Sequence, residues 1–359
     1  MALYTDENGT PVSTQSMAKT FLHCPREAYY KYVLGLRSKV SSRPLEVGKW
    51  MHSLLEAHYQ GEDWEPVHAR LSNRFQNLFD EEKEALGNLP VQNAELMRAY
   101  LWHYGDPQHK AYHWKVHEVE LKLEAELPNG HIFRGKFDML VEDEFGLWLV
   151  DHKNQRRFPD WNFRMLDMQS PMYIWLLRQN GIPVSGFIWN YIRTAGFPEM
   201  KVLKSGKSFY AKSWDAENDY THFARQFKLA RAKFPEFVRE GVEVERARAR
   251  VAQLKAQRWS PENPAGNPFF RREVIEKSDG MIERALAAFT ATSDRMHSYD
   301  FSDPDKVERD IDTCKGFMCN YKSLNIADLV NGDSSMLQRQ QYKKHDPLAY
   351  HDENDQLTL

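Results

Sequence analysis

Between residues 115 and 153, hydrophobic and polar positions alternate with a period of two, which predicts neighbouring β-strands. Residues 115–127 alternate almost strictly and end at a Pro-Asn-Gly turn sequence. Residues 134–153 predict a hairpin that turns at 143–146, because Asp at the first turn position and Gly at the fourth suit a type I turn. A further strand is predicted over residues 185–193.

Apolar residues spaced three and four apart predict helices on either side of these strands. Two short helices are expected within residues 13–36, the first capped by Ser13 or Ser16 and the second opened by Pro25. Further helices are expected over 45–60, within 64–113, over about 166–179 with a start near Ser170, over 212–256 and near 274–290, before a poorly ordered tail after about Gly332. The order helix, three strands, helix, strand predicts an α/β sandwich with a mixed sheet.

Two carboxylates are expected to face each other in the central hairpin. A turn centred between Glu144 and Phe145 pairs position n with position 289 − n, which places Asp138 opposite Asp151. Residues opposite each other in an antiparallel pair have Cβ atoms roughly 5 Å apart, so their carboxylates repel unless a proton or a cation lies between them. Lys153 falls on the same face, and oxygen ligands suit Mg²⁺ or Mn²⁺. Two alternatives stay open, a solvated hairpin with scattered charges and a one-residue bulge that sends the two Asp to opposite faces.

Composition narrows the class of protein. The chain has 359 residues, a net charge of −3 and no long apolar run, so neither a membrane span nor a global positive field is expected. Contacts with nucleic acid must therefore come from local basic patches. Three unevenly spaced cysteines do not predict a disulfide framework, and a reducing cytoplasm (the host cytoplasm for a phage-encoded protein) is the expected compartment.

Four short motifs occur in order on the predicted core: Gly48 with His52, Gly135 with Asp138, Asp151 with Lys153, and Gln169 with Tyr173. Together they resemble the RecB-like branch of the PD-(D/E)XK nucleases, which includes the Cas4-like exonucleases common in phages. The resemblance covers roughly residues 20–195, with a further echo near 311–325. It implies an α/β restriction-endonuclease-like core, a mixed central sheet flanked by helices, and helical N- and C-terminal additions that pack together.

The resemblance also implies roles for the motif residues. The divalent metal ligands would be His52, Asp138 and Asp151, with the backbone carbonyl of His152. Lys153 would orient or deprotonate the attacking water, while Gln169 and Tyr173 would position the loop and the scissile strand. Attack of hydroxide on an anionic phosphodiester needs a Lewis acid, in agreement with these roles. Glu56 and Glu118 are candidates for completing a second metal position.

The same family often carries an iron–sulfur cluster with one cysteine before the nuclease core and three after it. Cys24 matches the first place, and Cys314 and Cys319 match two of the later places. The last place holds Asn325, whereas a [4Fe–4S] cluster normally takes four thiolates. Three readings remain open: a cluster with an unusual fourth ligand, a vestigial site, and three unligated thiols.

The expected function is a metal-dependent DNA nuclease, an exonuclease acting on single strands or DNA ends in recombination, repair or phage DNA processing, with a helicase or recombination protein as a candidate partner. Two alternatives are a non-catalytic DNA-binding or scaffolding protein on the same fold and a structure-specific endonuclease. Candidate phosphate contacts are Lys136, Arg156, Arg157 and Arg164. The expected organisation is an N-terminal helical segment with Cys24 (1–45), a nuclease core (46–195) with a helical insertion (about 64–113), a C-terminal helical region with Cys314 and Cys319 (196–331) and a polar tail (332–359).

Overall fold

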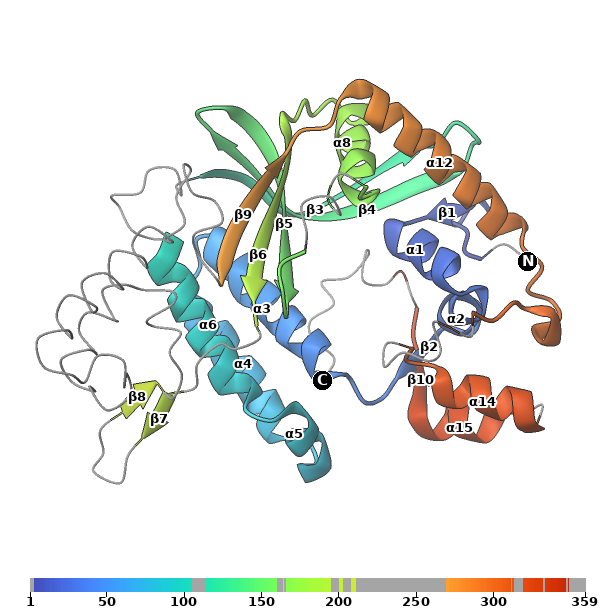
Figure 1. The fold of residues 1–359 in the computed structure, drawn as a ribbon, viewed down its shortest axis with the longest axis horizontal. Coiled ribbons are helices and arrows are strands. Elements are labelled where there is room, and N and C mark those ends of the chain that lie inside the picture. Colours follow the sequence, from blue (N-terminus) through green and yellow to red (C-terminus); the bar gives the residue numbers. More distant parts are fainter. Residues whose placement is uncertain are drawn as a thin grey trace, which may run out of the picture.

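A mixed β-sheet forms the centre of the computed structural model (Figure 1). The structure describes residues 3–104, 114–159, 164, 166–194, 200–202, 208–210, 269–310, 312, 319–331, 333–346 and 348. The sheet contains β1 (Val12–Ser13), β3 (Lys115–Glu126), β4 (Ile132–Asp143), β5 (Gly146–Gln155), β6 (Gly186–Arg193) and β9 (Phe270–Ile275). Strand β5 is antiparallel to β4 and parallel to β6, so the predicted mixed α/β architecture is confirmed.

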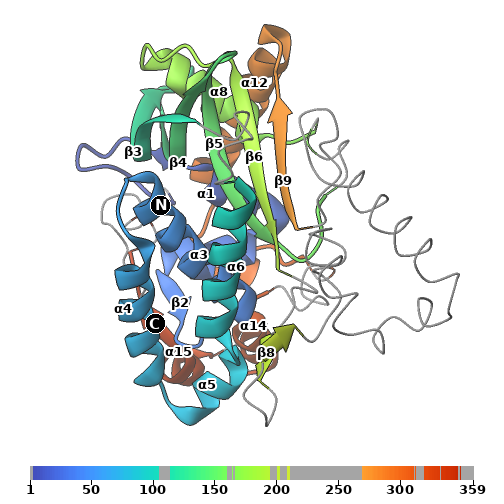
Figure 2. The ribbon, with the colours of Figure 1, turned by 90° about the vertical axis from the view of Figure 1, so that its left-hand side faces the viewer.

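Helices cover both faces of this sheet (Figures 1 and 2). On one face, α8 (Gln169–Gln179) and α12 (Asp279–Ser298) share a hydrophobic core with β4, β5 and β6. On the other, α3 (Arg43–Tyr59) packs with α4 (Trp64–Gln76), α5 (Asp80–Leu86) and α6 (Leu89–Tyr104). The apolar spacing of 45–60 and 64–113 therefore predicts these helices correctly, and α8 begins one residue before the expected Ser170.

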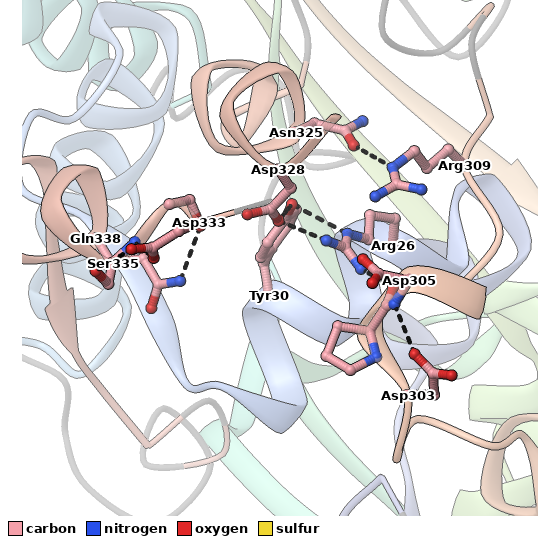
Figure 3. Close-up of polar contacts among 12 residues, drawn as sticks. Arg26, Tyr30, Asp303, Asp305, Arg309, Asn325, Asp328, Asp333, Ser335 and Gln338 are labelled. Atoms are coloured by element: carbon pink, nitrogen blue, oxygen red, sulfur yellow. Dashed lines mark hydrogen bonds and ion pairs between the residues drawn. The ribbon is translucent and has the colours of Figure 1, made fainter. Parts of the chain in front are cut away.

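The two ends of the described chain meet in a second unit, here called the terminal lobe (the described residues of 15–38 and 299–348). It comprises α1 (Gln15–His23), α2 (Pro25–Ala28), a π-helical turn (Tyr29–Val33), β2 (Leu36–Ser38), a 3₁₀ turn (Pro304–Lys306), α14 (Lys322–Asn331), α15 (Ser335–Gln341) and β10 (Tyr342–Lys344). Strand β2 pairs with β10, and Arg26 and Tyr30 contact Asp328 (Figure 3). The expectation that the terminal additions pack together is confirmed.

Three expectations about elements are wrong. The side chain of Thr14, and not Ser13 or Ser16, caps α1, since its hydroxyl accepts the backbone N–H of Met17. The helix expected from 274 begins only at Asp279, because residues 270–275 form β9 beside β6. Residues 335–344 form α15 and β10 inside the tail that was expected to be poorly ordered, since β10 finds a partner in β2.

The structure adds a short hairpin, β7 (Met200–Val202) with β8 (Ser208–Tyr210), that the pattern did not predict. The predicted helix over 212–256 lies outside the described residues. Within the described part of the chain, no helix is both long and apolar enough to cross a membrane.

Candidate active site

The two predicted acids lie where β4 and β5 separate. The pairing runs without a shift from Asp143 and Gly146 to Met139 and Val150, which follows the predicted 289 − n register; the ladder ends one pair before Asp138 and Asp151. Beyond that point β5 continues alongside β6, and Asp151 lies beside Trp189. The carboxylate of Asp138 occupies the opening, where its Oδ2 accepts the backbone N–H of His152 at 2.6 Å.

Asp151 is held from two sides. Its Oδ1 accepts a hydrogen bond from Gln169 Nε2 at 2.7 Å, and its Oδ2 lies 2.5 Å from the ammonium of Lys153. Gln169 is the first residue of α8, and the carboxylate of Asp167 accepts the backbone N–H of Gln169 at 2.9 Å, which anchors this end of the helix. The start of α8 therefore delivers one amide to the site.

His52 reaches the site from α3 on the opposite side of the sheet. Its Nε2 lies 2.9 Å from the carbonyl oxygen of His152, which can only accept, so Nε2 carries the proton. In the neutral ring, that tautomer leaves the lone pair on Nδ1, which lies 3.6 Å from Asp138 Oδ2. One turn earlier, Gly48 packs against β5, where a Cβ would make an ordinary van der Waals contact, 4.0 Å from the Cβ of Asn154.

The electrostatics of the site disfavour two unaccompanied carboxylates. Burial raises the pKa of Asp138 to about 6; nearby His52 and Lys153 act to lower it, and nearby Asp151 acts to raise it. Burial, with Asp151 and Asp138 adding to it, also raises the pKa of Tyr173, so its hydroxyl stays protonated. A positive charge beside Asp138 would reverse the penalty on its ionised form.

A third acid beside this pair escaped the sequence reasoning. Glu120 lies on β3 across from Asp138 on β4, since its neighbours Val119 and Leu121 pair with Met139 and Phe137. Its backbone φ is +58°, in the left-handed region that non-glycine residues seldom adopt. Its carboxylate is paired with the ammonium of Lys136. Burial first and then Glu120 raise the pKa of Glu56, so these two acids are neighbours, whereas Glu118 is exposed. The alternation of polar and apolar residues along β3 does not distinguish Glu120 from its neighbours. Its unusual backbone angle does, and that angle is visible only in the structure.

A buried polar chain supports the residue between the two strands. The Nδ1 of His152 lies 2.7 Å from Asn190 Nδ2, and Asn190 also donates to the hydroxyl of Tyr100 at 2.8 Å. The ring of Tyr59 stacks on His152 with centroids 5.8 Å apart. Burial, together with His52, lowers the pKa of His152 well below its ordinary value, so this imidazole is neutral. An amide within the otherwise apolar segment 186–192 was the only sequence signal of this support.

The four predicted phosphate contacts divide into two pairs. Arg156 and Arg157 are exposed in the loop after β5. Arg164 stacks over the rings of Trp189 and Tyr191, at 4.4 and 5.0 Å from their centroids, and the side chain of Lys136 is only 8% exposed in its ion pair with Glu120. In the described structure, the second pair is thus engaged with protein groups.

The predicted cluster cysteines lie in the terminal lobe or outside the described residues. Cys24 is buried at the junction of α1 and α2, and the backbone N–H of Asp310 points to its sulfur at 3.5 Å. Cys319 is half-buried, and Cys314 lies outside the described residues. The side-chain oxygen of Asn325, at the fourth place, accepts a hydrogen bond from Arg309 Nε at 2.8 Å (Figure 3).

The donors at the sheet opening suit a hard divalent cation. Two carboxylates, one imidazole nitrogen and one backbone carbonyl converge there, and burial raises the pKa of Asp138 although His52 and Lys153 act to lower it. Among the described residues, no three His, Cys, Asp or Glu side chains are already arranged as a metal-ligand cluster. Asp151 is instead engaged by Lys153 and Gln169.

Comparison with known proteins identifies the family of this chain. A family model described as the PD-(D/E)XK nuclease superfamily matches residues 13–324. Among solved structures, the crystal structure of SSO0001 is similar over 53% of this chain and 65% of that chain, with 12% identity and a TM-score of 0.24, a likeness too slight to carry an argument. No curated protein matches the chain. Because the family model spans most of its length, the chain belongs to the PD-(D/E)XK nuclease superfamily.

Proposed function

We propose that this protein is a metal-dependent exonuclease that hydrolyses phosphodiester bonds of single-stranded DNA or of DNA ends. Its superfamily implies a nuclease that uses Mg²⁺ or Mn²⁺. The observation that carries the proposal is the convergence of Asp138, Asp151 and Lys153 at the opening between β4 and β5, with His52 alongside. The four ordered motifs favour the RecB-like, Cas4-like branch of the superfamily.

In this proposal, His52 Nδ1, the carboxylates of Asp138 and Asp151, and the carbonyl of His152 hold the cation. When bound, the cation supplies a Lewis acid that lowers the pKa of water and shields charge on the phosphate. Asp138 is preorganised by the backbone N–H of His152, and Asp151 by the amide of Gln169. Both carboxylates are therefore aimed before any ligand arrives.

Lys153 is the proton-handling group in this proposal. Its ammonium lies 2.5 Å from Asp151 and 5.3 Å from the ring centroid of Trp189, so it is held beside the acids by both neighbours. A positioned ammonium orients the attacking water and offsets charge on the phosphate. The protonated hydroxyl of Tyr173, close to both acids, is a donor available to the scissile strand.

The test is cleavage of a 5′-labelled single-stranded oligonucleotide in Mg²⁺, in Mn²⁺ and in EDTA. We expect cleavage only with a divalent cation, and a loss of at least about 1,000-fold in Asp151→Asn and in Lys153→Met, because each removes a charged group from the reacting centre. DNA binding should largely persist in both variants. The matched controls are Glu142→Gln and Lys115→Met, which make the same chemical changes in an exposed ion pair on the same sheet.

Unchanged cleavage by both site variants would defeat the assignment. If the wild type bound DNA without cleaving it under any of these conditions, the non-catalytic DNA-binding alternative would replace it. Circular single-stranded DNA separates an exonuclease from an endonuclease, since only an endonuclease can cut it. Comparison of 5′- and 3′-labelled substrates gives the polarity.

The cluster is a separate part of the proposal. Cys24, Cys314 and Cys319 would supply three thiolates of an iron–sulfur cluster in the terminal lobe, and the engagement of Asn325 by Arg309 leaves the fourth place to another ligand. Iron content and visible absorbance of anaerobically purified protein test this. Colourless, iron-free protein would leave the thiols unligated and would not affect the nuclease assignment.

A further inference from the structure

A cavity of about 280 Å³ lies between the terminal lobe and the N-terminal part of α3. Its wall is built by α1 and α2, by β2 with the linker that follows it, by the first turns of α3, and by Tyr321 and Leu348 near the other end of the chain. Figure 1 shows the start of α3 facing the β2–β10 pair across this part of the molecule. The site described above uses none of these wall residues.

The wall of the cavity carries mostly positive charge. Lys31, Arg37 and Lys49 line it from three different elements, whereas Glu27 is the only acid in its lining. Glu27 has a partner of its own, since the imidazole of His23 lies 3.3 Å from its carboxylate. The hydroxyl oxygen of Ser41, also in the lining, is buried without a hydrogen-bond partner. Such a lining is suited to an anion that can also accept hydrogen bonds.

Helix α3 connects this cavity to the candidate active site. Lys49 and His52 are three residues apart on it, a rise of about 4.5 Å along the axis, and neighbours on the helix surface. The ammonium of Lys49 lies 3.0 Å from the buried carboxylate of Glu46, which fixes it at the cavity wall. An extended anionic chain in the cavity would therefore continue towards Asp138 along α3.

The size of the cavity limits its occupant. A sphere of this volume is about 8 Å across, narrower than even the roughly 12 Å major groove of B-DNA, so a duplex cannot enter. The volume lies close to the lower end, about 300 Å³, of small-ligand pockets. One strand, or a single nucleotide, is the matching ligand.

We propose that this cavity binds the sugar–phosphate backbone of the single strand whose scissile bond lies at Asp138 and Asp151, with Lys31, Arg37 and Lys49 contacting the phosphate oxygens that enter it. This inference rests on the proposed nuclease function and adds the route of the substrate. The terminal lobe then acts as one wall of the substrate site, so the enzyme selects unpaired DNA by excluding the duplex.

The test is binding of a 5′-fluorescein-labelled 12-residue oligothymidylate in EDTA, where no cleavage occurs, followed by anisotropy from 0.1 to 1 M salt. Removing two phosphate contacts in the Lys31→Ala/Arg37→Ala variant should reduce the slope of log K against log salt by about 1.4, or about 25-fold in affinity at 0.1 M relative to 1 M. The matched control is Lys39→Ala/Lys344→Ala. It removes the same charge from exposed residues at the β2–β10 pair that do not line the cavity.

A second variant guards against misfolding of the first. Val40 is 59% exposed and lines the cavity, so Val40→Glu should fold normally yet repel the strand, while Val40→Gln should bind nearly as the wild type. Thymidine 5′-monophosphate, titrated into the same proteins, distinguishes a strand site from a site for the released nucleotide.

Wild-type affinity and salt slope in Lys31→Ala/Arg37→Ala and in Val40→Glu would overturn the inference, even if the enzyme cleaves DNA. So would weakened binding of the monophosphate with unchanged binding of the oligonucleotide, because the cavity would then hold only product. The nuclease assignment is tested by cleavage in the Asp151 and Lys153 variants, and the strand route is tested by binding in EDTA. Failure of one can therefore be distinguished from failure of the other.

Discussion

Two regions of this protein bury charge in opposite ways. In the terminal lobe, Arg26 is 1% exposed and donates to Tyr30 at 3.0 Å, and its guanidinium lies 2.5 Å from the carboxylate of Asp328 (Figure 3). Burial acts to raise the pKa of Asp328, yet hydrogen bonds from Ser334, Tyr30 and Arg26 lower it overall. At the sheet opening, burial prevails and the pKa of Asp138 is raised.

The difference separates a structural ion pair from a binding site. The lobe matches one carboxylate with one guanidinium and a hydroxyl, so its charges are satisfied by the chain itself. The sheet opening brings two carboxylates close to one ammonium and an imidazole, and burial raises the pKa of Asp138 in spite of these neighbours. An ionisable group whose charged form destabilises the fold indicates a functional site. A buried ion pair whose two charges compensate each other does not.

The largest effect should come from Asp138→Asn, which tests the sheet opening. We expect cleavage to fall at least about 1,000-fold, since a proposed metal ligand is lost. At pH 8 without metal, the free energy of unfolding should rise by about 1–3 kcal/mol, because a buried carboxylate with a raised pKa destabilises the fold when ionised. Single-turnover cleavage and urea unfolding measure the two effects. Lower stability together with lost cleavage would contradict this account.

In the terminal lobe, a substitution in the ion pair should lower the free energy of unfolding instead of raising it. Arg26→Met removes the guanidinium from Asp328 and leaves its carboxylate with only the neutral hydroxyls of Tyr30 and Ser334, which should lower the free energy of unfolding by about 3–5 kcal/mol. The residual folded protein should cleave at nearly the wild-type rate at low temperature. Arg26→Met/Asp328→Leu should recover much of the loss, because it removes both charges. No recovery in the double variant would show that packing, and not charge, dominates the effect.

Divalent cations should raise the free energy of unfolding through the sheet opening and not through the terminal lobe. At a Mg²⁺ or Mn²⁺ concentration about 100 times Kd, binding to the folded state adds about 2.7 kcal/mol to the free energy of unfolding. We expect this gain in the wild type and in a destabilised lobe variant, and its disappearance in Asp138→Asn/Asp151→Asn. Thermal unfolding with and without the cation measures it. An equal gain in the double variant would place the cation elsewhere.

The smallest effect concerns pH. The pKa of Asp138 is raised to about 6 in the folded protein. Its protonation therefore stabilises the fold at a pH below the pKa of an unfolded Asp, and this stabilisation is lost as the pH rises through 6. His297 on α12 behaves in the reverse sense, because burial and the nearby His131 lower its pKa to about 4, and its contribution is lost as pH falls from 6.5 towards 4. His297→Gln should reduce the acid-side loss by about 1 kcal/mol. Urea unfolding between pH 4.5 and 8 measures both slopes.

The register of the central hairpin was more predictable from the sequence than its surroundings. A two-residue period and one turn are enough to pair β4 with β5 from Asp143 and Gly146 to Met139 and Val150, because strand geometry leaves a single register when one face is buried. Strand β9 was missed, because its charged residues Arg271 and Glu273 conceal a strand that is buried in the sheet. In the structure they lie 2.5 Å apart, and Arg271 stacks on Phe158.

Long-range partnerships could not be predicted from the sequence. Arg26 and Asp328 are 302 positions apart, and no local pattern shows that each satisfies the other. Strand β10 has three residues and no apolar alternation, so only its pairing with β2 defines it. The left-handed backbone of Glu120 likewise follows from tertiary context and not from the residue type.

The pairing of β2 with β10 has a consequence for biosynthesis. A ribosome adds roughly 5–20 residues per second, so β2 emerges many seconds before its partner. The sheet and α3 can form during that interval, whereas the lobe must wait for the residues around position 344. A nascent chain can therefore form the strands that carry Asp138, Asp151 and Lys153 before the terminal lobe is able to fold.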